Sequence, residues 1–166
     1  VERAIITVEY SAEEARRLRG ESCFTNEDQF NSSKLSITTR RPLGTIFCIT
    51  PFNFPLNLAL HKIAPAFASG NCILYKPSDC NYLLGQKLVE ICIQSGFPKH
   101  SIELICPSEN VLKDVVGDPR VNCISFTGGT NTANKIATLA GRKRLILELG
   151  GNDALVVYPD ADITKA

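Results

Sequence analysis

The stretch "VNCISFTGGTNTANKIA", residues 121–137, decides the fold, because a short apolar run rich in β-formers passes through two glycines into a helical pattern. A strand that leads directly into a helix is the repeating unit of a parallel sheet. The turn at Gly128 and Gly129 points free backbone N–H groups and a helix N-terminus at an anion. It matches neither the G-x-G-x-x-G fingerprint nor the P-loop, and a plain left-handed turn is the alternative.

The same alternation extends to both sides of this stretch. Gly70 and Gly96 stand where helix C-caps are expected. The pattern predicts an α/β fold, a Rossmann-like parallel sheet with helices on both faces. The expected strands cover residues 45–49, 71–75, 102–105, 121–125, 145–149 and 154–158, and the expected helices cover residues 57–69, 81–95, 109–116 and 131–140.

The N-terminal part has a different character. Apolar residues recur every three or four positions from Arg3 to Leu18, which predicts an amphipathic helix that Gly20 stops. Residues 21–34 are polar and predict turns, and residues 35–39 alternate like a half-exposed strand. We therefore divide the chain into an N-terminal helix and oligomerisation-type arm, residues 1–41, and an α/β body, residues 42–166.

Composition excludes several classes of function. The chain has 166 residues, 44% of them hydrophobic and 21% charged, and its net charge of +1 does not favour nucleic acid or an anionic membrane as a partner. The longest mostly apolar stretch, residues 56–68, contains His61, Lys62 and Pro65 and cannot cross a bilayer. No signal-peptide pattern opens the chain, so we expect a cytoplasmic protein.

The seven cysteines do not form a disulfide or metal-binding pattern. Their number is odd and no two stand closer than eight positions apart. We expect each of them to be reduced and buried as a small apolar residue, and we expect no metal site.

Ligands of an open α/β sheet bind beyond the carboxyl ends of its strands, so functional residues are expected in the loops that follow them. In "TPFNFP", residues 50–55, two prolines are expected to hold the backbone extended and to present Asn53 between two aromatic rings. A fixed amide is a good hydrogen-bond donor to an oxyanion. The alternative is an Asx-type turn with Phe52 and Phe54 in the core.

The loop "KPSD", residues 76–79, places a cation and a carboxylate together after the second strand, with Pro77 fixing the bend. Lys76 and Asp79 are able to hydrogen-bond ribose hydroxyls, and a carboxylate there would repel a 2′-phosphate. The alternative is a surface turn in which Asp79 caps the next helix.

In "LELGGND", residues 147–153, Glu148 stands where a strand becomes a loop, and Gly150 and Gly151 let the backbone approach a ligand. A partly apolar environment raises the pKa of a carboxyl group, which suits a general base. The alternative is a carboxylate paired with a lysine or an arginine.

Taken in order, "ITPFNFPLN", "HKIAPAFASGN", "YKPSD", "SFTGG" and "LELGGND" followed by "DAD" resemble the cofactor-binding half of the aldehyde dehydrogenase superfamily, over about residues 38–166. The resemblance implies an enzyme that oxidises a small aldehyde through a cysteine thiohemiacetal and passes a hydride to NAD, with NADP as the alternative. It assigns Asn53 to the oxyanion hole and Glu148 to the base that activates water. It assigns contacts with the cofactor to Thr50, Pro51, Phe52, Asn53, Lys76, Pro77, Ser78, Asp79, Thr127, Gly128, Gly129, Leu149 and Gly150.

Two departures from the family pattern affect what we expect. Asp79 stands where many relatives have Glu, and this shorter acid still argues for NAD. In the family the nucleophilic cysteine lies a few tens of residues beyond the Glu-Leu-Gly-Gly motif, a position that none of the seven cysteines matches. The chain starts at Val1 and contains no Met, so we expect a piece of a longer protein that is inactive alone.

The resemblance also implies partners. Residues 21–41 resemble part of the arm through which subunits of the family associate, so we expect a homo-oligomer, a dimer or a tetramer. Two other functions stay open. One is a non-enzymatic nucleotide-binding or structural remnant of the fold, and the other is an acyl-phosphate reductase, for which a water-activating acid such as Glu148 is not needed.

Overall fold

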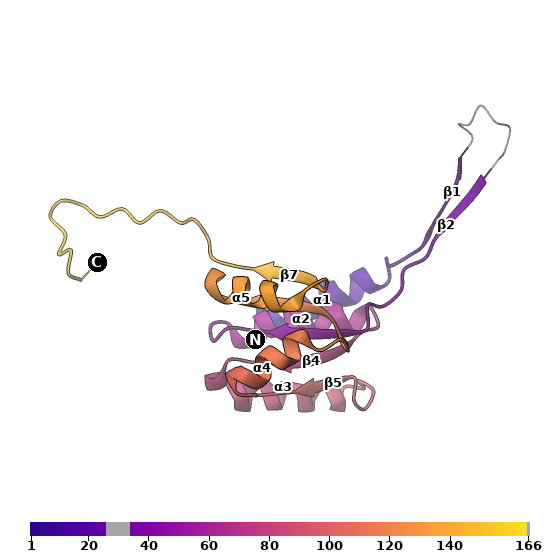
Figure 1. Ribbon diagram of the computed structural model, residues 1–166, viewed down its shortest axis with the longest axis horizontal. Coiled ribbons are helices and arrows are strands. Elements are labelled where there is room, and N and C mark those ends of the chain that lie inside the picture. Colours follow the sequence, from indigo (N-terminus) through magenta and orange to yellow (C-terminus); the bar gives the residue numbers. More distant parts are fainter. Residues whose placement is uncertain (26–33, 166) are drawn as a thin grey trace.

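The computed structural model describes residues 1–25 and 34–165, and Figure 1 shows the arrangement of its elements. Helices and strands alternate through most of the chain. They are α1 (Glu2–Ala15), β1 (Glu21–Thr25), β2 (Lys34–Thr38), β3 (Thr45–Ile49), α2 (Pro55–Ala68), β4 (Cys72–Lys76), the 3₁₀ turn η1 (Asp79–Asn81), α3 (Tyr82–Gln94), β5 (Ile102–Leu104), α4 (Glu109–Gly117), β6 (Val121–Thr127), α5 (Thr130–Ala140) and β7 (Arg144–Glu148).

A five-stranded parallel sheet in the order β5-β4-β3-β6-β7 forms the body. Phe47 of the central strand β3 stands opposite Leu74 of β4 and opposite Ile124 of β6. The chain proceeds from β3 outward to β5 and then crosses to the other side of β3, so the strand order reverses between β3 and β6. This confirms the predicted α/β fold and places a topological switch point where such folds bind ligands.

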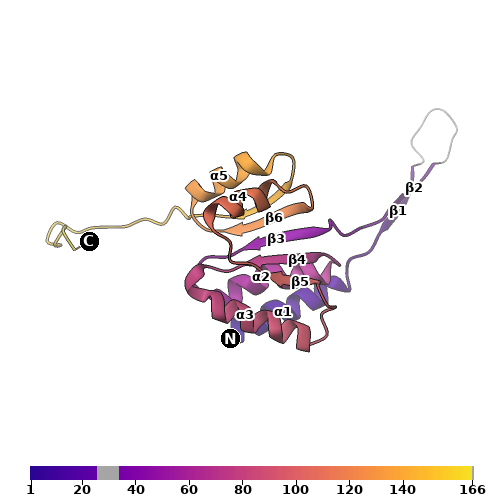
Figure 2. The same cartoon turned by 60° about the horizontal axis from the view of Figure 1, so that its bottom comes forward.

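Helices cover both faces of the sheet, as Figure 2 shows. The neighbours Phe47 and Cys48 in β3 are both 0% exposed, because successive side chains of a strand point to opposite faces. Cys48 packs with Ile63 of α2, and Phe47 packs with Ile136 of α5. Burial of a side chain of the size of Phe47 or Ile63 contributes about 1.5–3 kcal/mol.

Helices of the body end at the glycines that were expected to stop them, but α1 does not. Gly70 and Gly96 adopt φ values of 79° and 104° just after α2 and α3, as expected for helix termini. In contrast, α1 ends at Ala15, and the predicted end at Leu18 is wrong. The backbone N–H groups of Arg17 and Leu18 donate to carbonyls three residues back, so the helix tightens into a turn before Gly20.

The arm contains a second, two-stranded sheet that projects from the body (Figure 1). The strand predicted at residues 35–39 corresponds to β2. The prediction of turns from residue 21 is wrong for residues 21–25, which form β1 antiparallel to β2, with Cys23 opposite Ser36. Backbone pairing with β2 fixes this polar segment, which has no apolar periodicity of its own. Residues 26–33, the rest of the predicted turn, lie outside the described residues.

The strand predicted at residues 154–158 is wrong. After β7 the chain leads away from the sheet without regular structure (Figure 1), and Leu155 and Val156 are 79% and 73% exposed. A further parallel strand needs a crossover connection of a dozen or more residues, and no helix separates this run from β7. No helix within residues 1–25 and 34–165 is long and apolar enough to span a membrane.

Candidate functional site at the carboxyl edge of the sheet

The four loops singled out from the sequence all leave the same edge of the sheet, because they follow the carboxyl ends of the parallel strands β3, β4, β6 and β7. Backbone hydrogen bonds join them in pairs. The N–H of Thr50 donates to the carbonyl of Lys76 at 3.1 Å, and the N–H of Gly128 donates to the carbonyl of Glu148 at 3.1 Å. The candidate site therefore lies along one edge and includes the switch point.

The loop after β3 is held by polar contacts at its base. Thr50 is buried, and its Oγ1 lies 3.3 Å from the hydroxyl of Tyr75. The amide of Asn81 donates to the carbonyl of Phe52 at 2.9 Å, which ties this loop to the start of α3. Sequence reasoning did not identify Asn81 as a supporting residue.

The tip of this loop differs from both predictions. Phe54 adopts a left-handed conformation, with φ 46° and ψ 49°, so the prolines do not keep the segment extended. The chain turns sharply here because α2 begins at the next residue, Pro55. Phe52 and Phe54 are 70% and 61% exposed, so their expected packing in the core is also wrong. Asn53 between them is exposed, and its side chain takes part in none of the hydrogen bonds among the described residues.

Lys76 and Asp79 form an ion pair after β4. The Nζ atom of Lys76 lies 2.9 Å from Oδ1 of Asp79 and 3.0 Å from the carbonyl of Pro77. The lysine holds the pKa of Asp79 below its usual range. Asp79 caps neither η1 nor α3 with its side chain, so the capping alternative is wrong. The pair presents a lysine ammonium and an exposed carboxylate to the edge.

The glycine turn after β6 leads directly into α5. Gly129 is the N-cap of α5 with φ −71°, and neither Gly128 nor Gly129 has a positive φ, so the left-handed turn alternative is wrong. A Cβ atom on Gly128 would lie 2.5 Å from Cζ of Phe126, whereas one on Gly129 would meet nothing within 4 Å. No side chain caps α5, so its first N–H groups are available to an anion.

Glu148 at the end of β7 is an ionised acid rather than one with a raised pKa. The hydroxyl of Thr127 donates to Oε2 of Glu148 at 2.5 Å, and Nζ of Lys62 lies 3.5 Å from the same oxygen. The Thr127 hydrogen bond and, after it, the Lys62 charge lower the pKa of Glu148 against the opposing effect of burial. The predicted rise is therefore wrong, and the alternative of a lysine-paired carboxylate is what the structure shows.

Lys62 is a site residue that the sequence reasoning missed. It lies on the sheet-facing side of α2, is 3% exposed, and its Nζ donates to Oγ of buried Ser125 at 3.3 Å. Burial lowers the pKa of Lys62, while Glu148 opposes that shift. The available signal was a single lysine in the mostly apolar helix of residues 55–68.

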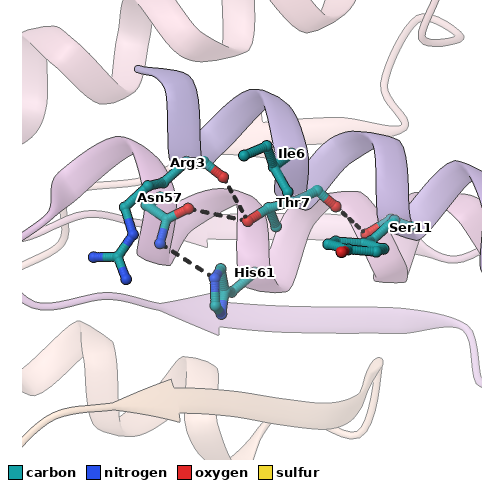
Figure 3. Close-up of a pocket in the computed structure, with 7 residues that line it drawn as sticks. Arg3, Ile6, Thr7, Ser11, Asn57 and His61 are labelled. Atoms are coloured by element: carbon teal, nitrogen blue, oxygen red, sulfur yellow. Dashed lines mark hydrogen bonds between the residues drawn. The ribbon is translucent and has the colours of Figure 1, made fainter.

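Two cavities lie on this side of the molecule, and one of them is lined by Glu148. One, of about 250 Å³, is lined by residues of α2, β6 and β7 that include Lys62, Ser125 and Glu148. The other, of about 470 Å³, lies between α1 and α2 (Figure 3). His61 lines both cavities.

The cysteines are less uniform than expected. Cys48, Cys92 and Cys123 are buried, but the prediction of burial is wrong for the four exposed cysteines, Cys23, Cys72, Cys80 and Cys106. Cys23 lies on β1, Cys80 lies in η1 and Cys106 lies in the loop after β5, whereas Cys72 opens β4 at an exposed position. Burial raises the pKa of Cys48, the thiol that interacts with Lys62, to about 12, so Cys48 is not a thiolate at neutral pH. In the described parts of the chain no three His, Cys, Asp or Glu residues cluster as a metal site.

Residues 1–166 match the model of the "Aldehyde dehydrogenase family" over their whole length. The chain is 48% identical to the sulfoacetaldehyde dehydrogenase of Neptuniibacter caesariensis over 156 residues, which cover 94% of this chain and 34% of that protein. It therefore spans about a third of the length of the curated relatives that it matches.

Solved structures agree with this match. The NADP-dependent glyceraldehyde-3-phosphate dehydrogenase of Bacillus halodurans C-125, complexed with NADP, superposes with a TM-score of 0.86 at 38% identity, covering 98% of this chain and 34% of that one. An NAD-dependent aldehyde dehydrogenase of Sinorhizobium meliloti superposes with a TM-score of 0.81 at 29% identity, covering 96% and 32%. The family binds NAD or NADP, and the chain belongs to the aldehyde dehydrogenase family.

Proposed function

We propose that this chain is the NAD(P)-binding part of an enzyme that oxidises a small aldehyde to a carboxylic acid through a cysteine thiohemiacetal. One observation carries the proposal. The ionised carboxylate of Glu148, held by Thr127 and Lys62, stands at the same sheet edge as the uncapped N-terminus of α5. A proton acceptor beside an anion-binding turn is the arrangement that this chemistry requires.

The residues of this edge fit a nicotinamide dinucleotide. The N–H groups at Gly129 and the start of α5 suit a pyrophosphate. A side chain at Gly128 would collide with Phe126, so glycine keeps the backbone of this turn in place. Lys76 and Asp79 suit ribose hydroxyls, and the exposed carboxylate favours NAD. The dinucleotide, when bound, supplies the hydride acceptor. We propose contacts from Thr50, Pro51, Phe52, Asn53, Lys76, Pro77, Ser78, Asp79, Thr127, Gly128, Gly129, Leu149 and Gly150.

Two side chains, Asn53 and Glu148, have the proposed catalytic roles. Asn53, which is exposed at the tip of the loop, donates a hydrogen bond to the oxyanion that forms when a thiolate attacks the aldehyde. Glu148 accepts a proton from the water that hydrolyses the thioester, and buried Lys62 compensates its negative charge. We propose that the thiolate comes from outside residues 1–166, since the resemblance places the nucleophilic cysteine after Glu148 and residues 149–166 contain no cysteine.

The names of the relatives support a proposal for the substrate class, and the arm supports a proposal for the assembly. Sulfoacetaldehyde and glyceraldehyde 3-phosphate, named for two of the relatives, each combine an aldehyde with an anionic group, and we propose a substrate of the same kind for this enzyme.

The two-stranded arm projects from the body, as a strand pair that joins another subunit would. We propose a homo-oligomer, a dimer or a tetramer, that associates through it.

The test combines titration calorimetry with NAD and NADP and an assay of NAD(P)H formation with aldehydes. The assay uses the complete natural protein, because the chain spans only about a third of its relatives. We expect saturable binding of NAD and aldehyde-dependent absorbance at 340 nm. Binding without turnover of any aldehyde would support a non-enzymatic nucleotide-binding protein instead, and no binding of either dinucleotide would refute the proposed cofactor site.

A further inference from the structure

A pocket of about 650 Å³ lies at the base of the arm, beside the ends of α1 and α2 and the beginning of β7. Figures 1 and 2 show the arm leaving this end of the body, whereas the tail that follows β7 leaves the opposite end. None of the residues proposed above for the cofactor or the chemistry lines this pocket. Its lining is Ala15, Leu18, Thr38, Thr39, Arg40, Arg41, Pro42, Leu43, Ala68, Ser69, Gly70, Asn71 and Arg144.

Three arginines bring positive charge to the pocket, and no described Asp or Glu lines it. Arg40, Arg41 and Arg144 are exposed. In the parts of the chain that the structure describes, ion pairs and side-chain hydrogen bonds join Arg17 and Arg120 to neighbouring acids, and none includes an arginine of the pocket. Like charges repel one another, so an anion in the pocket would stabilise the folded protein.

The end of α2 does not neutralise these arginines. The carbonyl groups at a helix C-terminus attract cations, but those that end α2 already accept hydrogen bonds. Oγ of Ser69 donates to the carbonyls of Pro65 and Ala66 at 2.7 and 3.1 Å. The N–H of Gly70 donates to the carbonyl of Phe67 at 2.8 Å. The guanidinium groups therefore remain available to an acceptor that enters from solvent.

Asn71 fixes the floor of the pocket. It is 7% exposed, and its amide donates to the carbonyl of Ala66 at 3.1 Å. Its Oδ1 accepts the N–H groups of Leu43 and Gly44 at 2.7 and 3.0 Å. This side chain joins the end of α2 to the segment that connects the arm with β3. A ligand therefore meets a floor that is already ordered, which reduces the entropy lost on binding.

The lining indicates the chemistry of the ligand. Each guanidinium offers N–H donors in one plane that match two oxygens of a phosphate or carboxylate group. Three of them suit a molecule with at least two negative charges. The volume lies in the range of sites for small molecules. Leu18 and Leu43, 49% and 44% exposed, add apolar surface for the carbon skeleton.

We propose that this pocket binds a small soluble molecule that carries at least two phosphate or carboxylate groups, held by Arg40, Arg41 and Arg144. The first two arginines belong to the arm segment and the third opens β7, so the ligand ties the arm to the body. The pocket is separate from the cofactor edge, and the inference does not depend on aldehyde oxidation.

The experiment measures binding of inorganic pyrophosphate to the complete natural protein by titration calorimetry, at constant ionic strength and with excess NAD. We expect saturable binding that Arg144→Gln weakens about 10- to 100-fold, the loss of one charged hydrogen bond. Arg144→Lys keeps the charge and should weaken binding less. The matched control is Arg142→Gln, which removes the same charge two positions away, outside the lining, and should change the affinity less than about twofold.

Three results would overturn the inference. Binding that excess NAD abolishes would belong to the cofactor site. Equal weakening in Arg142→Gln and Arg144→Gln would show general attraction of anions to a positive surface. Unchanged affinity in Arg144→Gln with an altered oligomeric state in light scattering would assign the arginine to a subunit contact.

Thermal unfolding without pyrophosphate tests the charge argument separately. At low ionic strength the midpoint of Arg144→Gln should equal or exceed that of wild type, because the substitution relieves repulsion among the arginines. Pyrophosphate should raise the midpoint of wild type more than that of the variant. A lower midpoint of Arg144→Gln in the absence of the anion would contradict the excess of positive charge on which the proposal rests.

Discussion

The Nζ atom of Lys62 lies 3.5 Å from Oε2 of Glu148, with the lysine side chain 1% exposed and the glutamate side chain 48% exposed. The cation is fixed on the core side of the sheet edge and the carboxylate faces the open side. This arrangement lets Glu148 exchange protons with a ligand or with water. Lys62 compensates the charge of Glu148 from a position that solvent does not reach.

Lys62→Met is expected to raise the pKa of Glu148, because the substitution removes a nearby positive charge and retains the volume of the side chain. The pKa is measured by NMR titration of carbon-labelled glutamate carboxyl groups. Lys87→Met is the control, since Lys87 is exposed and pairs only with Glu90 among the described residues. A pKa that stays the same or falls in Lys62→Met would contradict the role assigned to this lysine.

Thr127→Val is expected to raise the pKa of Glu148 as well, because the Thr127 hydroxyl is the largest cause that lowers it. A carboxyl group whose folded pKa lies below its unfolded value of 4.5 stabilises the fold above that pH and loses this contribution as the pH falls. Urea unfolding between pH 3 and 7 should therefore show less acid destabilisation in Thr127→Val. Thr127→Ser keeps the hydroxyl and should behave like wild type.

Gly128→Ala is expected to destabilise the fold by about 1–3 kcal/mol, because the new methyl group would overpack buried Phe126. Gly129→Ala is the matched control. It adds the same methyl group to open space at φ −71° and should change the free energy of unfolding by less than about 0.5 kcal/mol. Equal unfolding midpoints in urea for the two variants would contradict the packing argument.

Asp79→Asn is expected to shift cofactor preference toward NADP roughly tenfold, or about 1.4 kcal/mol. The substitution removes the carboxylate that would repel a 2′-phosphate and releases Lys76 from the ion pair at 2.9 Å. Calorimetric dissociation constants for NAD and NADP measure the shift. Asp114→Asn is a control on α4, and an unchanged ratio in Asp79→Asn would place the ribose site elsewhere.

The free energy of unfolding is expected to fall as the pH rises above about 9. The pKa of the Cys48 thiol is 9.0 in the unfolded chain and is raised by burial to about 12, so between these values the folded state holds a proton that the unfolded state has lost. Stability is therefore full below pH 9 and declines toward pH 12. Cys48→Ala should reduce this decline in chemical denaturation curves, whereas Cys72→Ala, at an exposed position, should not.

Much of the sheet was predictable, because each strand of the body is a short apolar run and alternates with a helical pattern. The prediction failed where pairing decides the structure. Residues 21–25 form a strand only through β2, and residues 154–158 have strand composition but no strand beside them among the described residues. The composition of a short segment does not show whether another strand lies beside it.

The location of the site was also predictable, because parallel strands bring their following loops to one edge. Its electrostatics were not. The pKa of Glu148 depends on Lys62, which belongs to a distant helix and reaches the acid only after the sheet has formed. The cavity around Arg3 and His61 likewise depends on the packing of α1 against α2, which no sequence motif records.

The outer side of β7 has a practical consequence for work with the isolated chain. β7 pairs with β6 along one edge, and no described strand pairs with its other edge. Ile146 and Leu147, which point to opposite faces of this edge strand, are 49% and 38% exposed. Unpaired peptide groups beside apolar side chains act as a template for intermolecular β-pairing. Residues 1–166 on their own should therefore aggregate as concentration increases, and a charged substitution such as Ile146→Lys should improve their solubility.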